Sequence, residues 1–70
     1  MSIAIGNQIK ALRQSIGMTQ ADFAKIFCVT PQAVSKWERN VSYPDITMLP
    51  TIARYFGISI DRLFGYDDVI

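Results

Sequence analysis

Hydrophobic side chains near the start of the chain recur with the period of a helix. They follow one another at steps of four, three and four residues: Ile5, Ile9, Leu12 and Ile16. That spacing puts them on one face and predicts an amphipathic helix over residues 2–16. Gly17 comes next, at a position where helices commonly end in a left-handed residue.

Between residues 19 and 38 the hydrophobic pattern changes phase once. Its apolar or small members are Phe23, Ala24, Phe27, Val29, Val34 and Trp37. One continuous helix cannot bury all of them, because the phase resets at residues 28–31. The pattern therefore predicts two short helices, over residues 19–27 and 30–39, joined by a tight turn. Helices of this length need a third element to cover their apolar faces.

Polar residues mark where these two helices begin. Thr19 can cap the first, and Asp22 three residues later makes a weaker version of the capping box. Thr30 can cap the second, with Pro31 at its first position, where a missing N–H costs nothing. Both predicted boundaries therefore rest on side-chain chemistry as well as on periodicity.

The remainder of the chain predicts two further helices, over residues 46–56 and 59–64. Pro50 lies inside the first of them, where a proline would break a regular helix. Either residues 46–48 form a separate tight turn that leaves Pro50 in the first turn of the helix proper, or one helix starts irregularly at Ile46. We favour the separate turn. Asp45 and Ser59 are the expected caps.

The sequence thus predicts an all-α fold of five helices, with one domain over residues 1–66 and a tail over residues 67–70. Half of the 70 residues are hydrophobic, which suffices for a compact core without a disulfide or a metal site. The single cysteine cannot form an internal disulfide, and the absence of histidine excludes the usual Cys/His zinc sites. We expect no metal and no cofactor.

Several functional classes find no support in the sequence. No apolar run approaches the roughly 18 residues that span a membrane, and the N-terminus does not have the pattern of a signal peptide. A reducing, cytoplasmic setting is expected. Without a histidine, a phosphate-cradling glycine loop or an evident carboxylate pair, no catalytic site can be proposed, so we predict a protein that is not an enzyme. No small-molecule effector site is evident either.

Charge is distributed unevenly along the chain, although the net charge is only +1. Residues 1–40 contain five basic and two acidic side chains, a balance of +3, and residues 41–70 contain two basic and four acidic ones, a balance of −2. The positive half includes the helix over residues 30–39. This polarity favours a polyanionic partner on that side, although an accidental distribution is the alternative.

Residues 19–38 resemble the helix-turn-helix of the lambda-repressor/Cro-like family, also called the xenobiotic-response-element family. The matching positions are Gln20, Ala24, Val29, Val34, Trp37 and Glu38. The similarity continues through residues 9–13 upstream, and through residues 44–46 and 63–65 downstream. This resemblance implies a five-helix domain that binds double-stranded DNA and lays the helix over residues 30–39 in the major groove.

The resemblance also implies which residues meet DNA. The expected base contacts are Gln32, Lys36, Ala33, Ser35 and Pro31. Gln32 suits adenine, whereas Lys36 suits guanine or a phosphate. Many relatives have a polar, base-contacting residue at the position of Pro31. The proline can make only apolar contact with a base. The expected phosphate contacts are Gln20, Thr30, Arg39, Asn40, Ser42 and Tyr43. Trp37 is expected in the core.

Two other positions carry structural expectations from the family. Arg13 and Glu38 occupy positions that pair in relatives, so a partly buried ion pair is expected between the first and third helices. Cys28 stands in the turn where relatives usually have glycine. We predict either a positive φ at Cys28, at a cost of about 1 kcal/mol, or a reshaped turn that avoids it.

The function implied is that of a sequence-specific transcriptional regulator, with repression the expected role. Two copies on a near-palindromic operator would read two half-sites, so a homodimer is expected. Its apolar patch would comprise Phe64, Tyr66, Val69 and Ile70. These residues could instead pack on their own domain or lead into a further segment. The alternatives are a protein-interaction module, such as an antitoxin or anti-repressor, and the DNA-binding end of a longer regulator.

Overall fold

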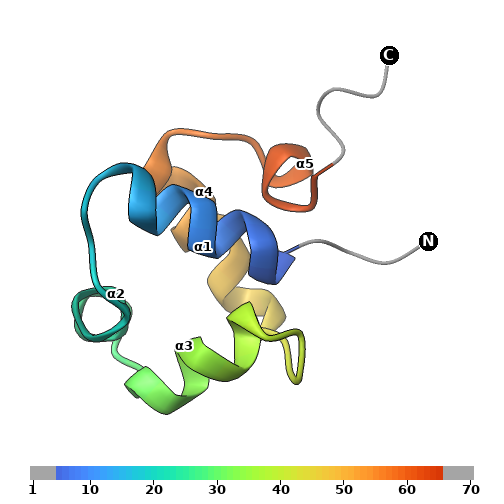
Figure 1. Ribbon diagram of the computed structural model, residues 1–70. Helices are drawn as coiled ribbons and strands as arrows, with labels where there is room; N and C mark the ends of the chain where they lie inside the picture. Colours follow the sequence, from blue (N-terminus) through green and yellow to red (C-terminus); the bar gives the residue numbers. More distant parts are fainter. Residues whose placement is uncertain (1–4, 66–70) are drawn as a thin grey trace.

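The computed structural model describes residues 5–65, which form five α-helices and one short 3₁₀ turn (Figure 1). In chain order these are α1 (Ile5–Ser15), α2 (Gln20–Ile26), α3 (Pro31–Glu38), η1 (Ile46–Met48), α4 (Leu49–Phe56) and α5 (Ile60–Leu63). The predicted all-α, five-helix class is confirmed. Residues 2–4 of the first predicted helix and the predicted tail over residues 67–70 lie outside the described residues.

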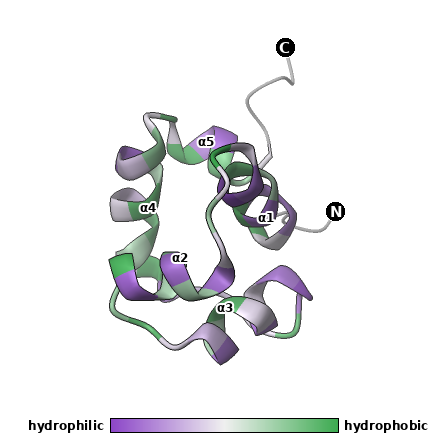
Figure 2. Cartoon of the chain, turned by 60° about the vertical axis from the view of Figure 1, so that its left-hand side comes forward, coloured by the Kyte–Doolittle hydropathy of each residue, from purple (hydrophilic) through white to green (hydrophobic). Residues whose placement is uncertain are grey.

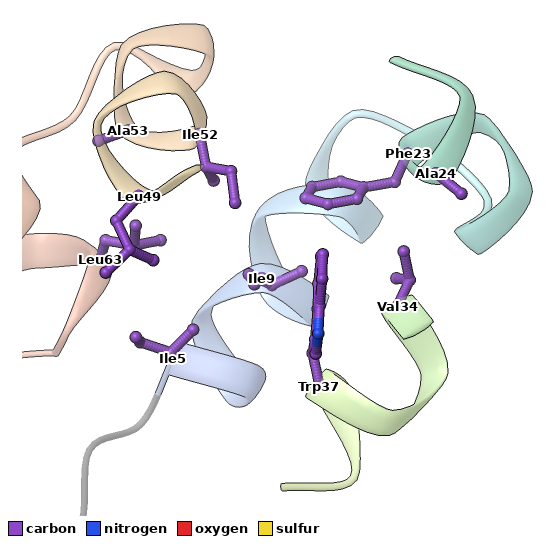
Figure 3. Packing of buried hydrophobic residues seen from close by; sticks show 10 residues of the cluster. All are labelled: Ile5, Ile9, Phe23, Ala24, Val34, Trp37, Leu49, Ile52, Ala53 and Leu63. Carbon is purple, nitrogen blue, oxygen red and sulfur yellow. The ribbon is translucent and has the colours of Figure 1, made fainter. Parts of the chain in front are cut away.

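The core is a single apolar cluster to which every α-helix contributes. Figure 3 shows Phe23 of α2 and Trp37 of α3 meeting next to Ile9 of α1. The ring planes of Phe23 and Trp37 are nearly perpendicular, with centroids 6.5 Å apart. The other buried members are Ile5, Ala24, Val34, Leu49, Ile52, Ala53 and Leu63. The third element that the two short helices need includes α1, whose Ile9 lies beside Phe23 and Trp37 in the same cluster (Figure 3).

The apolar stripe of α1 is one residue shorter than predicted. Ile5 and Ile9 are buried and Leu12 packs against the core, but Ile16 is 57% exposed. The helix ends at Ser15, and Gly17 takes a φ of 70° while the amide of Met18 donates to a carbonyl in the last turn. This left-handed ending turns Ile16 outward, so the periodicity continued one step beyond the helix.

Caps form at the starts of α2, α3 and α5. Thr19 and Asp22 exchange both hydrogen bonds of a capping box, at 3.0 and 3.1 Å. The Thr30 hydroxyl accepts from the amide of Ala33, and Pro31 occupies the first turn. Ser59 caps α5 in the same way. The prediction for Asp45 is wrong, because its carboxylate accepts the hydroxyl of Thr47 and makes no bond to the backbone of η1.

The separate turn favoured before α4 is present. Residues of η1 precede the helix, and Pro50 lies within its first turn, where the proline interrupts no internal hydrogen bond. Gly57 ends α4 with a φ of 68°. Proline and glycine therefore bracket this helix as the sequence indicated.

The turn between α2 and α3 contains the expected backbone strain. Cys28 has a φ of 58°, in the left-handed region that favours glycine, and its side chain is exposed. The next amide, that of Val29, donates to the carbonyl of Ala24 over 2.9 Å and closes α2. The chain thus keeps the turn geometry at Cys28 and does not reshape it.

Candidate nucleic-acid interface

α3 presents a bare polar side to its surroundings. Val34 is 0% and Trp37 is 6% exposed, so these two residues fix which side faces the core. On the opposite side Gln32 and Lys36 are exposed, and Pro31 is exposed at the start of the helix. Ala33 and Ser35 are half-buried at its edges. The structure therefore places all five predicted base readers on α3, with Gln32 and Lys36 exposed on the side away from the core.

Hydropathy colouring gives the same picture for the whole molecule. In Figure 2 hydrophilic and hydrophobic segments alternate along α1, α2 and α3, as amphipathic helices require. The loop that follows α3 extends the polar surface. There Asn40, Tyr43 and the C-cap residue Arg39 are exposed, and Ser42 is half-buried.

The loop leaves α3 through a left-handed residue that was not predicted from the sequence. Asn40 has a φ of 61°, and the amides of Val41 and Ser42 both donate to the carbonyl of Lys36. Asparagine tolerates this conformation at the end of a helix, so its position after Arg39 was an available signal. Because of this turn, the chain reverses beside the end of α3.

A buried carboxylate joins α1, α2 and α3. Glu38 accepts two hydrogen bonds from Arg13, from Nε at 2.8 Å and from Nη2 at 2.9 Å, so the expected ion pair is present. The Arg13 side chain is 10% exposed and that of Glu38 is 4% exposed. Arg13 also donates to the carbonyl of Met18 at 2.8 Å, which holds the α1–α2 connection.

Gln20 is the third partner of that carboxylate. Its Nε2 donates to Glu38 Oε1 over 3.0 Å, from the first residue of α2. Nothing in the sequence spacing indicated this bond, because eighteen residues separate the two side chains. Gln20 was predicted to bind a phosphate, and with Nε2 directed at Glu38 one of its two N–H groups is committed within the protein.

Arg13 and Glu38 each stabilise the charged form of the other. Burial raises the pKa of Glu38, but the hydrogen bonds from Arg13 and Gln20 and the charge of Arg13 outweigh it, so the pKa is lowered overall. The hydrogen bond to Glu38 raises the pKa of Arg13. Glu38 is therefore ionised at neutral pH and can only accept, which requires the amide nitrogen of Gln20 to face it.

A second unforeseen contact lies on the outward side of α3. Arg39 Nε donates to the hydroxyl oxygen of Ser35 over 3.3 Å. The two residues are four positions apart, which places them next to each other on a helix surface. The guanidinium of Arg39 is thereby drawn back along α3 instead of extending beyond its end.

The predicted contacts do not all gather at one place. Thr30 lies at the start of α3 with its hydroxyl oxygen engaged in the cap, and Gln20 lies on α2. Phe64 is half-buried and packs against the core. The other members of the predicted dimer patch, Tyr66, Val69 and Ile70, lie outside the described residues.

A hollow of about 380 Å³ lies elsewhere on the surface, between the end of α1 and α2. It is lined by Ile16, Gly17, Met18, Asp22, Lys25 and Ile26, none of which belongs to α3. Within residues 5–65 no three acidic or cysteine side chains group as metal ligands. No helix in the same range is long and apolar enough to cross a membrane.

Comparisons with known proteins agree on one family. A family model described as helix-turn-helix matches residues 9–63. The transcriptional activator BcrR of Enterococcus faecalis is 32% identical over 63 residues, which are 90% of this chain and 31% of that protein. The P22 c2 repressor, solved in complex with a synthetic operator, matches with a TM-score of 0.81 and 29% identity over 94% of this chain and 100% of that one.

The same fold also occurs inside a protein of another kind. The crystal structure of apo-HppE matches with a TM-score of 0.75 and 28% identity, covering 89% of this chain and 34% of that one. The chain thus spans about a third of the length of BcrR and of HppE. Three findings agree: the family match over residues 9–63, the arrangement of α2 and α3, and the likeness to the P22 c2 repressor. The chain therefore belongs to the helix-turn-helix family and has the lambda-repressor-like fold of the Cro/C1 type.

Proposed function

We propose that this chain is a sequence-specific double-stranded DNA-binding module of a transcriptional regulator, with α3 seated in the major groove. One observation carries the proposal: the side of α3 opposite Val34 and Trp37 is exposed and polar, although the helix is firmly packed on its other side. A major groove about 12 Å wide accommodates one helix of this kind. The likeness to the P22 c2 repressor, solved with an operator, supports the proposal.

The exposed side of α3 carries groups that suit base edges. The amide of Gln32 can accept from N6 of adenine through its oxygen and donate to N7 through one N–H. Lys36, one turn further along, suits guanine or a phosphate. Ala33 and Pro31 offer apolar contact to a thymine methyl, and Ser35 offers a hydroxyl.

Residues around α3 suit the phosphates on either side of the groove. We assign this role to Gln20, Thr30, Asn40, Ser42 and Tyr43. Positive charge supports it, because the balance is +3 over residues 1–40 and −2 over residues 41–70. Gln20 would use the N–H that does not bond Glu38.

A single helix this short reads few bases, so we infer that two copies act together. They would bind half-sites about 34 Å apart, or a multiple of that spacing, on a near-palindromic operator. Phe64, Tyr66, Val69 and Ile70 would contribute to the contact between the copies. The domain, over residues 1–66, would act in the cytoplasm, in a repressor or an activator, and would itself catalyse no reaction.

Selection of bound duplexes from a random pool tests this function directly. We expect an enriched motif with two-fold symmetry. Gln32→Ala should then weaken binding to the selected duplex by about 1–3 kcal/mol and relax the preference at one base position. Gln14→Ala is the matched control, since this exposed glutamine lies on α1 and outside the proposed contacts.

The alternative of a protein-interaction module predicts a different result. Binding to DNA through phosphates weakens steeply as salt rises. If the purified protein retards no duplex at low or high salt, the DNA-binding proposal fails and the interaction role is favoured. If it retards duplexes but Gln32→Ala leaves the preference unchanged, binding occurs but α3 is not the reading element.

A further inference from the structure

We propose that Arg39 reads a guanine in the major groove and that Ser35 is the positioning residue that aims it. This inference rests on the proposed DNA-binding function and deepens it. It differs from the expectation that Arg39 merely binds a phosphate. The bond between Arg39 Nε and Ser35 Oγ, at 3.3 Å, is the observation that leads to it.

The position of Arg39 on the helix surface is the first part of the argument. Arg39 follows Gln32 by seven residues, close to two turns of a helix with 3.6 residues per turn. The two residues therefore lie almost on one line along the helix. That line runs opposite Val34 and Trp37, so Arg39 belongs to the outermost strip of α3 and its C-cap.

The direction of the side chain is the second part. Long helical side chains lean toward the N-terminus of their helix. The bond to Ser35 holds Arg39 in that direction, with the guanidinium about one turn before its own Cα. The charged group therefore lies along the exposed side, beside Ser35, and away from the loop that begins at Asn40.

The remaining hydrogen-bonding capacity is the third part. Arginine has five N–H donors in a planar fork, and Ser35 takes the one on Nε. The two terminal amino groups stay side by side, in the arrangement that binds O6 and N7 of guanine together. Because the Ser35 oxygen accepts, its own proton remains available for a donor bond to DNA.

A fixed orientation distinguishes base reading from phosphate binding. A phosphate responds to charge, which lysine supplies as well as arginine, whereas only the planar fork of arginine presents two parallel N–H groups in a fixed orientation to O6 and N7. The distance along α3 from Gln32 to Ser35 is about 4.5 Å at 1.5 Å per residue. The guanine should therefore lie one or two base pairs from the position that Gln32 reads.

The test uses the duplex selected by the wild-type protein, with single guanines replaced by 7-deazaguanine, which keeps base pairing but lacks the N7 acceptor. We expect one guanine at which the wild-type protein loses about 5- to 150-fold in affinity. For Arg39→Lys that penalty should shrink, because lysine has no planar fork, although the charge is kept and the salt dependence stays that of the wild type. Arg54→Lys, an exposed arginine on α4, is the matched control and should retain the penalty.

Ser35→Ala tests the positioning role. It removes the anchor and leaves both the charge and the fork, so the 7-deazaguanine penalty should shrink at the same guanine and at no other. Melting curves of each variant establish that it is folded. An unchanged penalty in Ser35→Ala overturns the positioning role of Ser35.

The outcomes separate this inference from the proposed function. If Arg39→Lys keeps the wild-type penalty at every guanine, and only Arg39→Ala weakens binding evenly and flattens the salt dependence, Arg39 is a phosphate ligand and the inference is wrong. The proposed function then stands. If the wild-type protein selects no duplex at all, the proposed function itself fails.

Discussion

Gln20 donates its side-chain amide to Glu38 over 3.0 Å and so ties the first residue of α2 to the last residue of α3. Glu38 is at the same time the partner of Arg13 on α1. One carboxylate therefore sets the mutual placement of three helices. The hydrophobic core holds them together, and this polar junction supplies the directional bonds that fix how they meet.

Removing the carboxylate should cost more stability than removing Gln20. Glu38→Ala leaves Arg13 charged and largely buried without its partner, which costs about 3–5 kcal/mol for a buried pair. Gln20→Ala removes one hydrogen bond, worth about 1 kcal/mol. In urea denaturation, Gln20→Ala should lower the free energy of unfolding less than Glu38→Ala does. Equal midpoints for Glu38→Ala and the wild type would show that the pair contributes only specificity.

The junction should make the fold sensitive to acid. Hydrogen bonds lower the pKa of Glu38 in spite of its burial, and bonds from Thr19 lower the pKa of Asp22. A carboxylate with a lowered pKa stabilises the fold above its unfolded pKa, and that contribution disappears as the pH falls through the folded pKa. The free energy of unfolding should therefore decline as the pH drops below about 4.5.

Glu38→Gln provides the comparison for that decline. It should be less stable than the wild type at neutral pH and should lose less on acidification, because one of the two titrating groups is gone. Chemical denaturation at a series of pH values measures both slopes. A decline as steep as that of the wild type would mean that Glu38 contributes nothing to the acid sensitivity.

Cys28→Gly should stabilise the domain. The φ of 58° at Cys28 costs a residue with a Cβ about 1 kcal/mol, which glycine avoids, although glycine gives back part of the gain through its freedom in the unfolded chain. The side chain is exposed, so little packing is lost. Thermal melting should show a rise of a few degrees at most. Cys28→Ala keeps the strained Cβ and should melt at the wild-type temperature.

Gly6→Ala should destabilise the domain by roughly 1–3 kcal/mol, as overpacking does. A Cβ at Gly6 would stand 2.0 Å from the carbonyl oxygen of Trp37, so α1 and α3 would have to separate. The neighbouring Asn7 is exposed, and Asn7→Ala is the control that should leave the midpoint of denaturation almost unchanged. If both variants unfold alike, the close approach at Gly6 is easily relieved.

Much of the fold could be predicted from the sequence because its signals are local. Thr19 and Thr30 bond amides three residues away, and Pro50 and Gly57 constrain their own backbone. Ile16 shows the limit of this approach. Its spacing continues the apolar stripe, but the helix ends at Ser15, just before the left-handed Gly17, and Ile16 is exposed.

The candidate site was harder to predict from the sequence, because hydrogen bonds between side chains of distant segments produce no periodic pattern. The resemblance indicated Arg13 and Glu38 as partners, but nothing indicated that Gln20 would join them. The bond from Arg39 to Ser35 is local, yet its importance depends on which side of α3 faces outward. That side was predictable from Val34 and Trp37, whereas the direction of a long side chain was not.

Gly6 of α1 lies directly against the backbone carbonyl of Trp37, on the side of α3 that faces the protein. Gln32, Ser35 and Arg39 lie on the side that faces away from it. Anchorage and recognition are thus divided between different side chains of one short helix. The outward side chains could be substituted without changing how α3 packs on the domain, which makes the domain a suitable scaffold for engineering new DNA-sequence preferences.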